Sequence, residues 1–121
     1  LQDGEIRTKK GPVFQTAIIA GTFAAKKTSE IIPFCHPLLI EGCKLMVNAN
    51  PDELKIWVDA EVEISGKTGV EMEALTAVST ALLTIYDMCK ALGPTMQIGG
   101  IELMSKSGGK KDYVKDNTHA S

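Results

Sequence analysis

The chain has 121 residues, enough for one compact domain and too few for two of ordinary size. Hydrophobic residues make up 44% and charged residues 23% of the chain, a balance typical of a globular protein. A formal net charge of −2 and 5% aromatic residues argue against a nucleic-acid-binding surface, which needs a basic face and stacking rings. No uninterrupted apolar run approaches the roughly 20 residues of a membrane-spanning helix. We therefore expect neither a nucleic acid nor a membrane as a partner.

Cysteine usage favours a reducing compartment. Cys35, Cys43 and Cys89 are odd in number and widely spaced, without a Cys-x-x-Cys pair, so neither a disulfide framework nor a standard zinc site is predicted. The sequence opens at Leu1 without a signal segment, and its first four residues read as the end of a helix. We expect a cytoplasmic protein whose domain is incomplete at the N-terminus.

The first predicted helix starts at Gly11-Pro12, with Pro12 in the first helical position, where its missing N–H costs nothing. Apolar residues recur at helical spacing from Val13 to about Glu30, and Pro33 then ends the helix. Several residues of this stretch are small and would let another backbone approach closely: Ala17, Gly21, Ala24 and Ala25.

Two strands follow the first helix. Apolar residues alternate over 45–49 and again, strictly, over 54–64, which is the period of a strand with one buried face. The turn cluster Asn50-Pro51-Asp52 separates them, so the pattern predicts a β-hairpin.

A second helix is predicted from Thr68 to about Leu92, opened by a capping box over 68–71 and ended by Gly93-Pro94. It is apolar or small around most of its circumference, so we expect the sheet and a second partner, such as another subunit, to cover it. A last strand is predicted over 96–104, and 107–121 reads as a mobile tail behind a single domain of residues 1–106.

The predicted order is therefore helix, strand, strand, helix, strand. One further strand upstream of Leu1 would give βαββαβ, the ferredoxin-like α+β arrangement with helices on one face of an antiparallel sheet. We expect that first strand to be missing from this chain.

Asp87 and Lys90 form an unusual polar pair within the apolar second helix. Three residues apart, they share one helix face and can touch. They could be an ordinary surface pair; alternatively, a partly buried carboxylate beside an amine is suited to proton transfer. Glu73 lies fourteen positions earlier, roughly 21 Å away along the helix axis. One small site could use both carboxylates only if the ligand is long or if two chains pair.

The remaining polar candidates are a histidine and several lysines. His36 lies between two prolines on a stiff backbone, which suits precise placement, although a lone histidine is more often structural. Lys10 precedes a helix N-terminus, where free N–H groups favour anions. The sequence Gly66-Lys67-Thr68 ends like a phosphate-binding loop, but Glu61 stands where its first glycine is required, so that motif is rejected.

Several longer blocks resemble one family. They are KKGPVF at 9–14, IPFCHPL at 32–38, GKTGVEMEALTA at 66–77, TIYDMCK at 84–90 and KSGGK at 106–110. Together they resemble the cyclic pyranopterin monophosphate synthase (MoaC-type) family of molybdenum cofactor biosynthesis, over about residues 4–110. Relatives are also expected to carry an N-terminal segment with an acidic residue and an arginine, which nothing here matches, and some to carry an acidic residue where this chain has Pro12.

The resemblance implies a lyase that converts 3′,8-cyclo-7,8-dihydroguanosine 5′-triphosphate to cyclic pyranopterin monophosphate and releases pyrophosphate. It also implies a homohexamer, a trimer of dimers, with active sites at subunit interfaces. No cofactor is expected, although Mg²⁺ could accompany the triphosphate. By matching positions, the implied catalytic residues are Asp87, Lys90 and Lys10, and the implied substrate-binding residues are Phe34, Cys35, His36, Met72, Glu73, Lys26 and Lys106.

The residues agree chemically with this implication. A triphosphate bears about four negative charges and needs several cations, which the lysines and His36 could supply. The alternative is a non-catalytic ferredoxin-like domain that senses a small anion. It would account for the apolar second helix, but not for Asp87 and Lys90 set within it.

Overall fold

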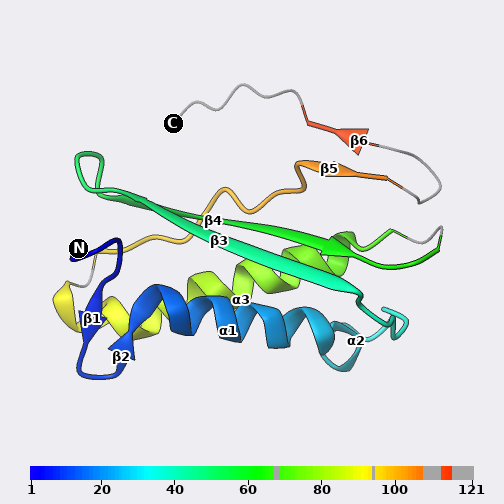
Figure 1. Cartoon of the computed structure of the whole chain (residues 1–121), viewed down its shortest axis with the longest axis horizontal. Helices are drawn as coiled ribbons and strands as arrows, with labels where there is room; N and C mark the ends of the chain where they lie inside the picture. The colour runs from blue at the N-terminus through cyan, green and yellow to red at the C-terminus, as the bar shows by residue number, and fades with distance from the viewer. Residues whose placement is uncertain (67–68, 94, 108–112, 116–121) are drawn as a thin grey trace.

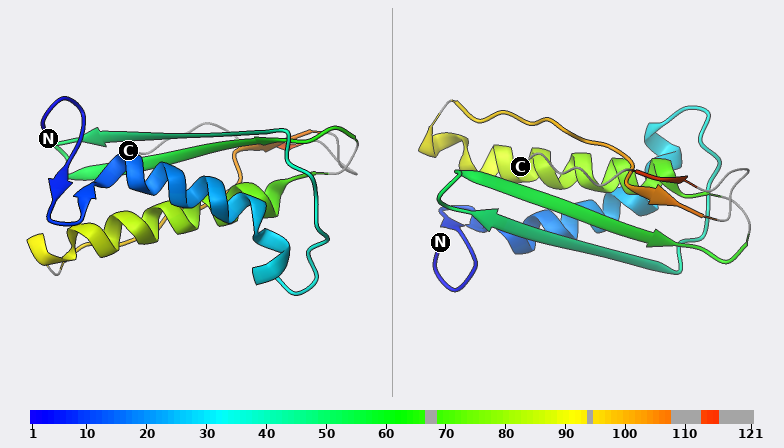
Figure 2. Two further views of the ribbon diagram at one scale, coloured as in Figure 1. Left: turned by 60° about the horizontal axis from the view of Figure 1, so that its bottom comes forward. Right: turned by 90° about the horizontal axis from the view of Figure 1, so that it is seen from above.

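The computed structural model describes residues 1–66, 69–93, 95–107 and 113–115, and shows an α+β structure in two layers (Figure 1). One layer is a hairpin of β3 (Gly42–Asn50) and β4 (Lys55–Glu63), and the other is a pair of helices, α1 (Val13–Lys26) and α3 (Glu71–Cys89). Both helices cover the same face of the hairpin (Figure 2). The shorter elements are β1 (Arg7–Thr8), β2 (Gly11–Pro12), α2 (Thr28–Ile31), the 3₁₀ helix η1 (Lys90–Leu92), β5 (Ser105–Lys106) and β6 (Tyr113–Val114).

The predicted hairpin is confirmed. β3 and β4 pair antiparallel from Gly42 opposite Glu63 to Asn50 opposite Lys55. The strict alternation in β4 places its apolar side chains toward the helices, where they pack against the core. The Asn50 side chain accepts hydrogen bonds from the backbone N–H groups of Asp52 and Glu53, which closes the turn.

The first helix is shorter at both ends than its pattern predicts. Pro12 is the N-cap residue, with an extended backbone at φ −74° and ψ 124°, so the prediction that it is the first helical residue is wrong by one position. The helix breaks at Lys27, and α2 adds a separate short turn. The buried Thr28 follows the break, and its hydroxyl donates to the carbonyls of Ala24 and Ala25. That hydroxyl satisfies carbonyls at the end of the helix.

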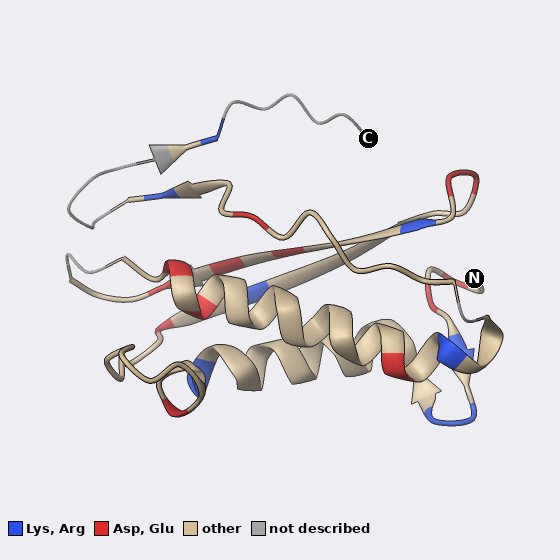
Figure 3. Ribbon diagram, turned by 180° about the vertical axis from the view of Figure 1, so that it is seen from behind, with Lys and Arg blue, Asp and Glu red and all other residues tan. Residues whose placement is uncertain are grey.

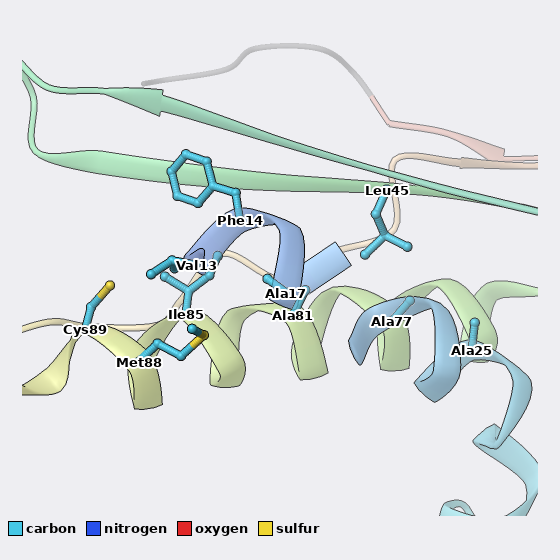
Figure 4. Close-up of a cluster of buried hydrophobic side chains, with 10 residues drawn as sticks. All are labelled: Val13, Phe14, Ala17, Ala25, Leu45, Ala77, Ala81, Ile85, Met88 and Cys89. Atoms are coloured by element: carbon cyan, nitrogen blue, oxygen red, sulfur yellow. The ribbon is translucent and has the colours of Figure 1, made fainter. Parts of the chain in front are cut away.

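The core lies where α1, α3 and β3 meet (Figure 4). Gly21 allows this approach: a Cβ there would lie 2.8 Å from the Ala77 carbonyl oxygen of α3 and 2.4 Å from Cδ2 of Leu45. The close contact expected of the small residues in α1 is thus confirmed, with α3 as the approaching backbone. The buried cluster consists of Val13, Phe14, Ala17, Ala25, Leu45, Ala77, Ala81, Ile85, Met88 and Cys89.

The second helix begins at Glu71, and the capping box predicted over 68–71 is wrong in its assignment of the cap. Val70 is the N-cap residue and makes no side-chain capping hydrogen bond, while Thr68 lies outside the described residues. By length and composition alone, Glu71–Leu92 could cross a membrane. In this structure it packs along α1 and against β4.

No strand forms over 96–104, contrary to the prediction; this segment runs alongside β4 without a ladder between them. Directly after this segment, Ser105–Lys106 forms a short strand, which pairs with Tyr113–Val114. Most of the tail predicted over 107–121 lies outside the described residues. A groove of about 850 Å³ separates β4 from the segment 99–107, and its floor includes Ala74, Leu75, Val78 and Leu82 of α3.

Candidate active site

Asp87 lies between two lysines at the C-terminal end of α3. Its Oδ1 is 3.0 Å from Nζ of Lys90, and its Oδ2 is 3.0 Å from Nζ of Lys10. The hydrogen bond and charge of Lys90, together with those of Lys10, lower the pKa of the Asp87 carboxyl. Figure 3 shows the charged positions at this end of α3 beside the β1–β2 hairpin. The cluster of one carboxylate and two ammonium groups therefore carries a net charge of +1.

The sequence predicts part of this geometry. The contact between Asp87 and Lys90, expected from their spacing of three, is confirmed. The expected burial is wrong for this chain, since the two side chains are 53% and 59% exposed. The side chains that α3 buries nearby are Ile85, Met88 and Cys89, which face the core, whereas Asp87 lies on the outer side. Local patterns do not indicate the contact of Lys10 with Asp87, because 77 positions separate them; it is the family resemblance that groups the two residues in one site.

Lys10 sits at the tip of the small β1–β2 hairpin, in which Arg7 pairs with Pro12 and Thr8 with Gly11. Gly11 has a φ of +116°, which suits glycine and strains other residues. The neighbouring helix N-terminus does not offer the free N–H groups that the sequence suggested for an anion. The Glu5 carboxylate already accepts hydrogen bonds from the backbone of Phe14 and Gln15. That part of the expectation is wrong, and it is the side chain of Lys10 that brings positive charge to Asp87 from this hairpin.

The second polar cluster lies at the other end of α3. Glu73 is only 4% exposed, and its Oε2 accepts a hydrogen bond from the Cys35 thiol at 3.5 Å. Burial raises the pKa of the Cys35 thiol, and the charge of Glu73 raises it further. Oε1 of Glu71 lies 3.9 Å from Nζ of Lys106, while its Oε2 is buried without a hydrogen-bond partner among the described residues. A carboxylate oxygen in that condition has spare capacity for a donor.

The other implied substrate-binding residues lie at positions where the structure gives them few specific contacts. Phe34 is 98% exposed, and His36 is exposed beside it. Lys26 is exposed in the last turn of α1, where its charge reaches Cys43, and Met72 is half-buried in α3. None of these four side chains makes a hydrogen bond or ion pair within residues 1–66, 69–93, 95–107 and 113–115.

The structure therefore assembles two separate clusters, and no hydrogen bond or ion pair between described residues joins them. The interval of fourteen residues along α3 corresponds to about 21 Å, as the sequence indicates. Among the residues the structure describes, no group of three or more His, Cys, Asp or Glu side chains is arranged to hold a metal ion. The chemistry that these clusters offer is proton transfer and phosphate binding.

Comparison with known proteins agrees with the family resemblance seen in the sequence. The sequence model of the MoaC family matches residues 2–109. A cyclic pyranopterin monophosphate synthase of Clostridium botulinum is 54% identical over 109 residues, covering 89% of this chain and 69% of the relative. The synthase of the same name from Helicobacter hepaticus is 56% identical over 111 residues, covering 91% and 70%. Molybdenum cofactor biosynthesis protein 1 of Dictyostelium discoideum is 57% identical over 106 residues, covering 88% of this chain and 17% of that protein.

Proposed function

Since this chain belongs to the MoaC family, we infer that it is an enzyme of molybdenum cofactor biosynthesis that forms cyclic pyranopterin monophosphate. The observation that carries this conclusion is identity above one half to two synthases of that name, over about nine-tenths of the chain. The proposed substrate is 3′,8-cyclo-7,8-dihydroguanosine 5′-triphosphate, and the second product is pyrophosphate. We propose that it is a soluble, cytoplasmic lyase without a resident cofactor, with Mg²⁺ as a companion of the triphosphate.

Asp87, Lys90 and Lys10 are the proposed catalytic residues. A carboxyl whose pKa is lowered by two ammonium groups is ionised at neutral pH, so Asp87 is able to accept a proton, as a weaker base than an unpaired carboxylate. Closing a cyclic phosphate requires a substrate hydroxyl to attack the α-phosphorus while the bond to pyrophosphate breaks. In this proposal the hydroxyl proton passes to Asp87, and the lysines stabilise charge on the phosphates. The excess positive charge of the cluster supports this assignment.

The residues at the other end of α3 are proposed to bind the rest of the substrate. Buried Glu73 and the unpartnered Oε2 of Glu71 could accept N–H donors from a guanine-derived ring. The remaining proposed binding residues are Phe34, Cys35, His36, Met72, Lys26 and Lys106. Because the two ends of α3 are too far apart for one small site, we propose that each site joins the Asp87 end of one chain to the Glu73 end of another.

Exposed apolar side chains support such a pairing. On α1, Ile19 and Phe23 are 55% and 58% exposed and lie one turn apart, and Leu83 on α3 is 60% exposed. The proposed assembly is a homohexamer built as a trimer of dimers. Its dimer interface would cover these side chains and complete the active sites.

The groove beside β4 supports a ferredoxin-like fold as the finer description. Its walls are β4 and the segment 99–107, and α3 forms its floor, so one extended strand between the walls would join them into a single antiparallel sheet. The order of that sheet would be 99–107, the added strand, β4, β3. The proposal explains why 96–104 has the pattern of a strand but no ladder in this chain.

The activity is tested by incubating the full-length protein with the cyclic guanosine triphosphate substrate. Pyrophosphate and cyclic pyranopterin monophosphate should appear together, and Lys90→Ala should fold normally but lose turnover. Lys44→Ala is the matched control, since Lys44 is exposed on β3 and belongs to neither cluster. A wild-type protein that binds the substrate without releasing pyrophosphate would instead be an anion sensor.

Site sharing is tested by mixing two inactive variants. Lys90→Ala disables one end of the site and Glu73→Gln the other. In a mixed dimer with shared sites, one of the two sites carries neither substitution, so a statistical mixture should recover about a quarter of wild-type turnover. Sites made within one chain would recover none.

A further inference from the structure

The Glu5 carboxylate makes an unusual set of three backbone hydrogen bonds at the base of the hairpin that carries Lys10. Its Oε1 accepts from the N–H of Ile6 at 2.8 Å and of Phe14 at 2.7 Å, and its Oε2 accepts from Gln15 at 3.0 Å. Ile6 enters the hairpin, whereas Phe14 and Gln15 leave it in the first turn of α1. One side chain therefore ties both ends of this ten-residue excursion together.

Pro12 makes this arrangement necessary. It occupies the N-cap position of α1, but it has no side-chain acceptor, and the first turn contains no acidic residue. The orphan N–H groups of that turn are satisfied instead by Glu5, seven positions before the N-cap. Burial alone would raise the pKa of Glu5, but the three N–H donors and the charge of Arg7 outweigh it, and the net shift is downward.

The tip of the clamped hairpin meets the proposed catalytic cluster. Lys10 extends from the tip to Asp87 Oδ2 at 3.0 Å, and its backbone N–H donates to the hydroxyl of Thr8. Val13, the first residue of α1, is fully buried and donates its N–H to the Ile6 carbonyl at 2.8 Å. The base of the hairpin is thus anchored in the core. Because Lys10 lies at the tip of the same short hairpin, the position of the base constrains the position of Lys10.

We propose that Glu5 is a positioning residue, which clamps the base of the β1–β2 hairpin and so holds Lys10 against Asp87. The inference rests on the proposed function, because it is the reaction that requires Lys10 in place. The plainer reading is that Glu5 only caps α1. The two readings differ in where the acceptor must come from. An acceptor at the N-cap position itself would be enough to cap α1, whereas the clamp requires the acceptor for Phe14 and Gln15 to lie at the other end of the hairpin, on Glu5.

A pair of variants separates the two readings. Glu5→Ala removes both cap and clamp, and adding Pro12→Asp restores an N-cap acceptor without restoring the link between residue 5 and the first turn of α1. The double variant is compared with Pro12→Asp alone, which keeps Glu5. Both are assayed at a temperature at which circular dichroism shows them folded, so that unfolded protein does not enter the rates.

The clamp predicts that the double variant melts close to Pro12→Asp but loses kcat/KM, by about 100-fold if Lys10 is displaced by 1 Å or more. The acidic limb of its pH–rate profile should also move to higher pH. The charged groups that contact Asp87 are Lys90 from η1 and Lys10 from the hairpin, and only Lys90 would remain. Equal kcat/KM and coincident profiles would overturn the proposal and leave Glu5 as a cap.

A second readout does not depend on turnover. Carboxyl-carbon NMR titration should show a higher pKa for Asp87 in the double variant than in Pro12→Asp, because one of its two lysines has withdrawn. An unchanged Asp87 titration contradicts the clamp. If the wild-type protein released no pyrophosphate, the proposed function would fail, and this titration would still decide whether Glu5 holds Lys10.

Discussion

At Gly21, α1 lies so close to α3 and β3 that adding one methyl group there tests the packing of the helix layer. In Gly21→Ala the new Cβ would lie 2.4 Å from Leu45 Cδ2 and 2.8 Å from the Ala77 carbonyl oxygen. Carbon atoms in contact normally lie about 3.5–4.0 Å apart. The Leu45 methyl could rotate into what little space surrounds it, but the Ala77 oxygen is backbone, so α1 and α3 must move apart.

Two opposing terms set the size of the effect. Alanine is favoured over glycine in a helix by about 1 kcal/mol, whereas overpacking a filled core costs about 1–3 kcal/mol. Because both a side chain and a backbone atom are in the way, we expect the upper part of that range and a net loss of about 1–2 kcal/mol. For a chain of 121 residues this corresponds to a fall in Tm of about 3–10 °C.

The measurement is urea and thermal unfolding followed by far-ultraviolet circular dichroism. Gly42→Ala is the matched control, since its Cβ would lie 3.6 Å from the nearest atom, an ordinary contact with Glu63. We expect that control to stay within about 0.5 kcal/mol of wild type. A Gly21→Ala protein as stable as wild type, or more stable, would refute the close approach of α1 to Ala77.

Two further predictions concern titrating groups. The pKa of Glu5 in the folded chain is lowered from 4.5, so its carboxylate stabilises the fold above that pH, and this stabilisation is lost as the pH falls through the folded value. Glu5→Gln should therefore lower the free energy of unfolding by about 1 kcal/mol at pH 7, and the difference from wild type should shrink progressively below pH 4.5; a difference independent of pH would contradict it. The Cys35 thiol should react slowly with iodoacetamide at pH 8, because burial and the Glu73 charge raise its pKa, and Glu73→Gln should accelerate that reaction severalfold, measured by peptide mass spectrometry. An unchanged rate in Glu73→Gln would show that the carboxylate does not act on the thiol.

Local patterns were enough to predict the hairpin and the contact between Asp87 and Lys90. The alternation in 54–64 depends only on which residues face the core, and the contact depends only on helical spacing. The small residues of α1 likewise indicated a close neighbour, although not that Gly21 would face Ala77. Each of these features is settled within a short stretch of chain.

Features that depend on distant segments were missed. The capping carboxylate of α1 comes from Glu5, nine residues before Phe14, whereas capping patterns look within one turn. Lys10 meets Asp87 because a hairpin folds back onto the end of α3; periodicity does not indicate this contact, and only the family resemblance grouped the two residues. The segment 96–104 has a strand pattern but lacks a ladder, since a strand forms only where a neighbour supplies hydrogen bonds. The exposure of Asp87 was missed as well, because the apolar composition of α3 does not tell which of its faces the rest of the chain leaves uncovered.

The two polar clusters on α3 also define how a second chain must approach if sites are shared. A two-fold axis that sets Asp87 of one chain beside Glu73 of its partner must pass midway between those positions, near Thr80. Residues at helical spacing share that face, among them Thr76, Thr80, Leu83 and Asp87. The two threonines are half-buried, whereas Leu83 is 60% exposed. Leu83→Arg should therefore abolish both dimerisation and turnover with unchanged helix content, because a buried unpaired guanidinium is costly. Light scattering after size exclusion and pyrophosphate release are the measurements, with Leu54→Arg, at a position 91% exposed in the hairpin turn, as the control. A Leu83→Arg protein that stays dimeric and active would place the interface, and the sharing of sites, on another face.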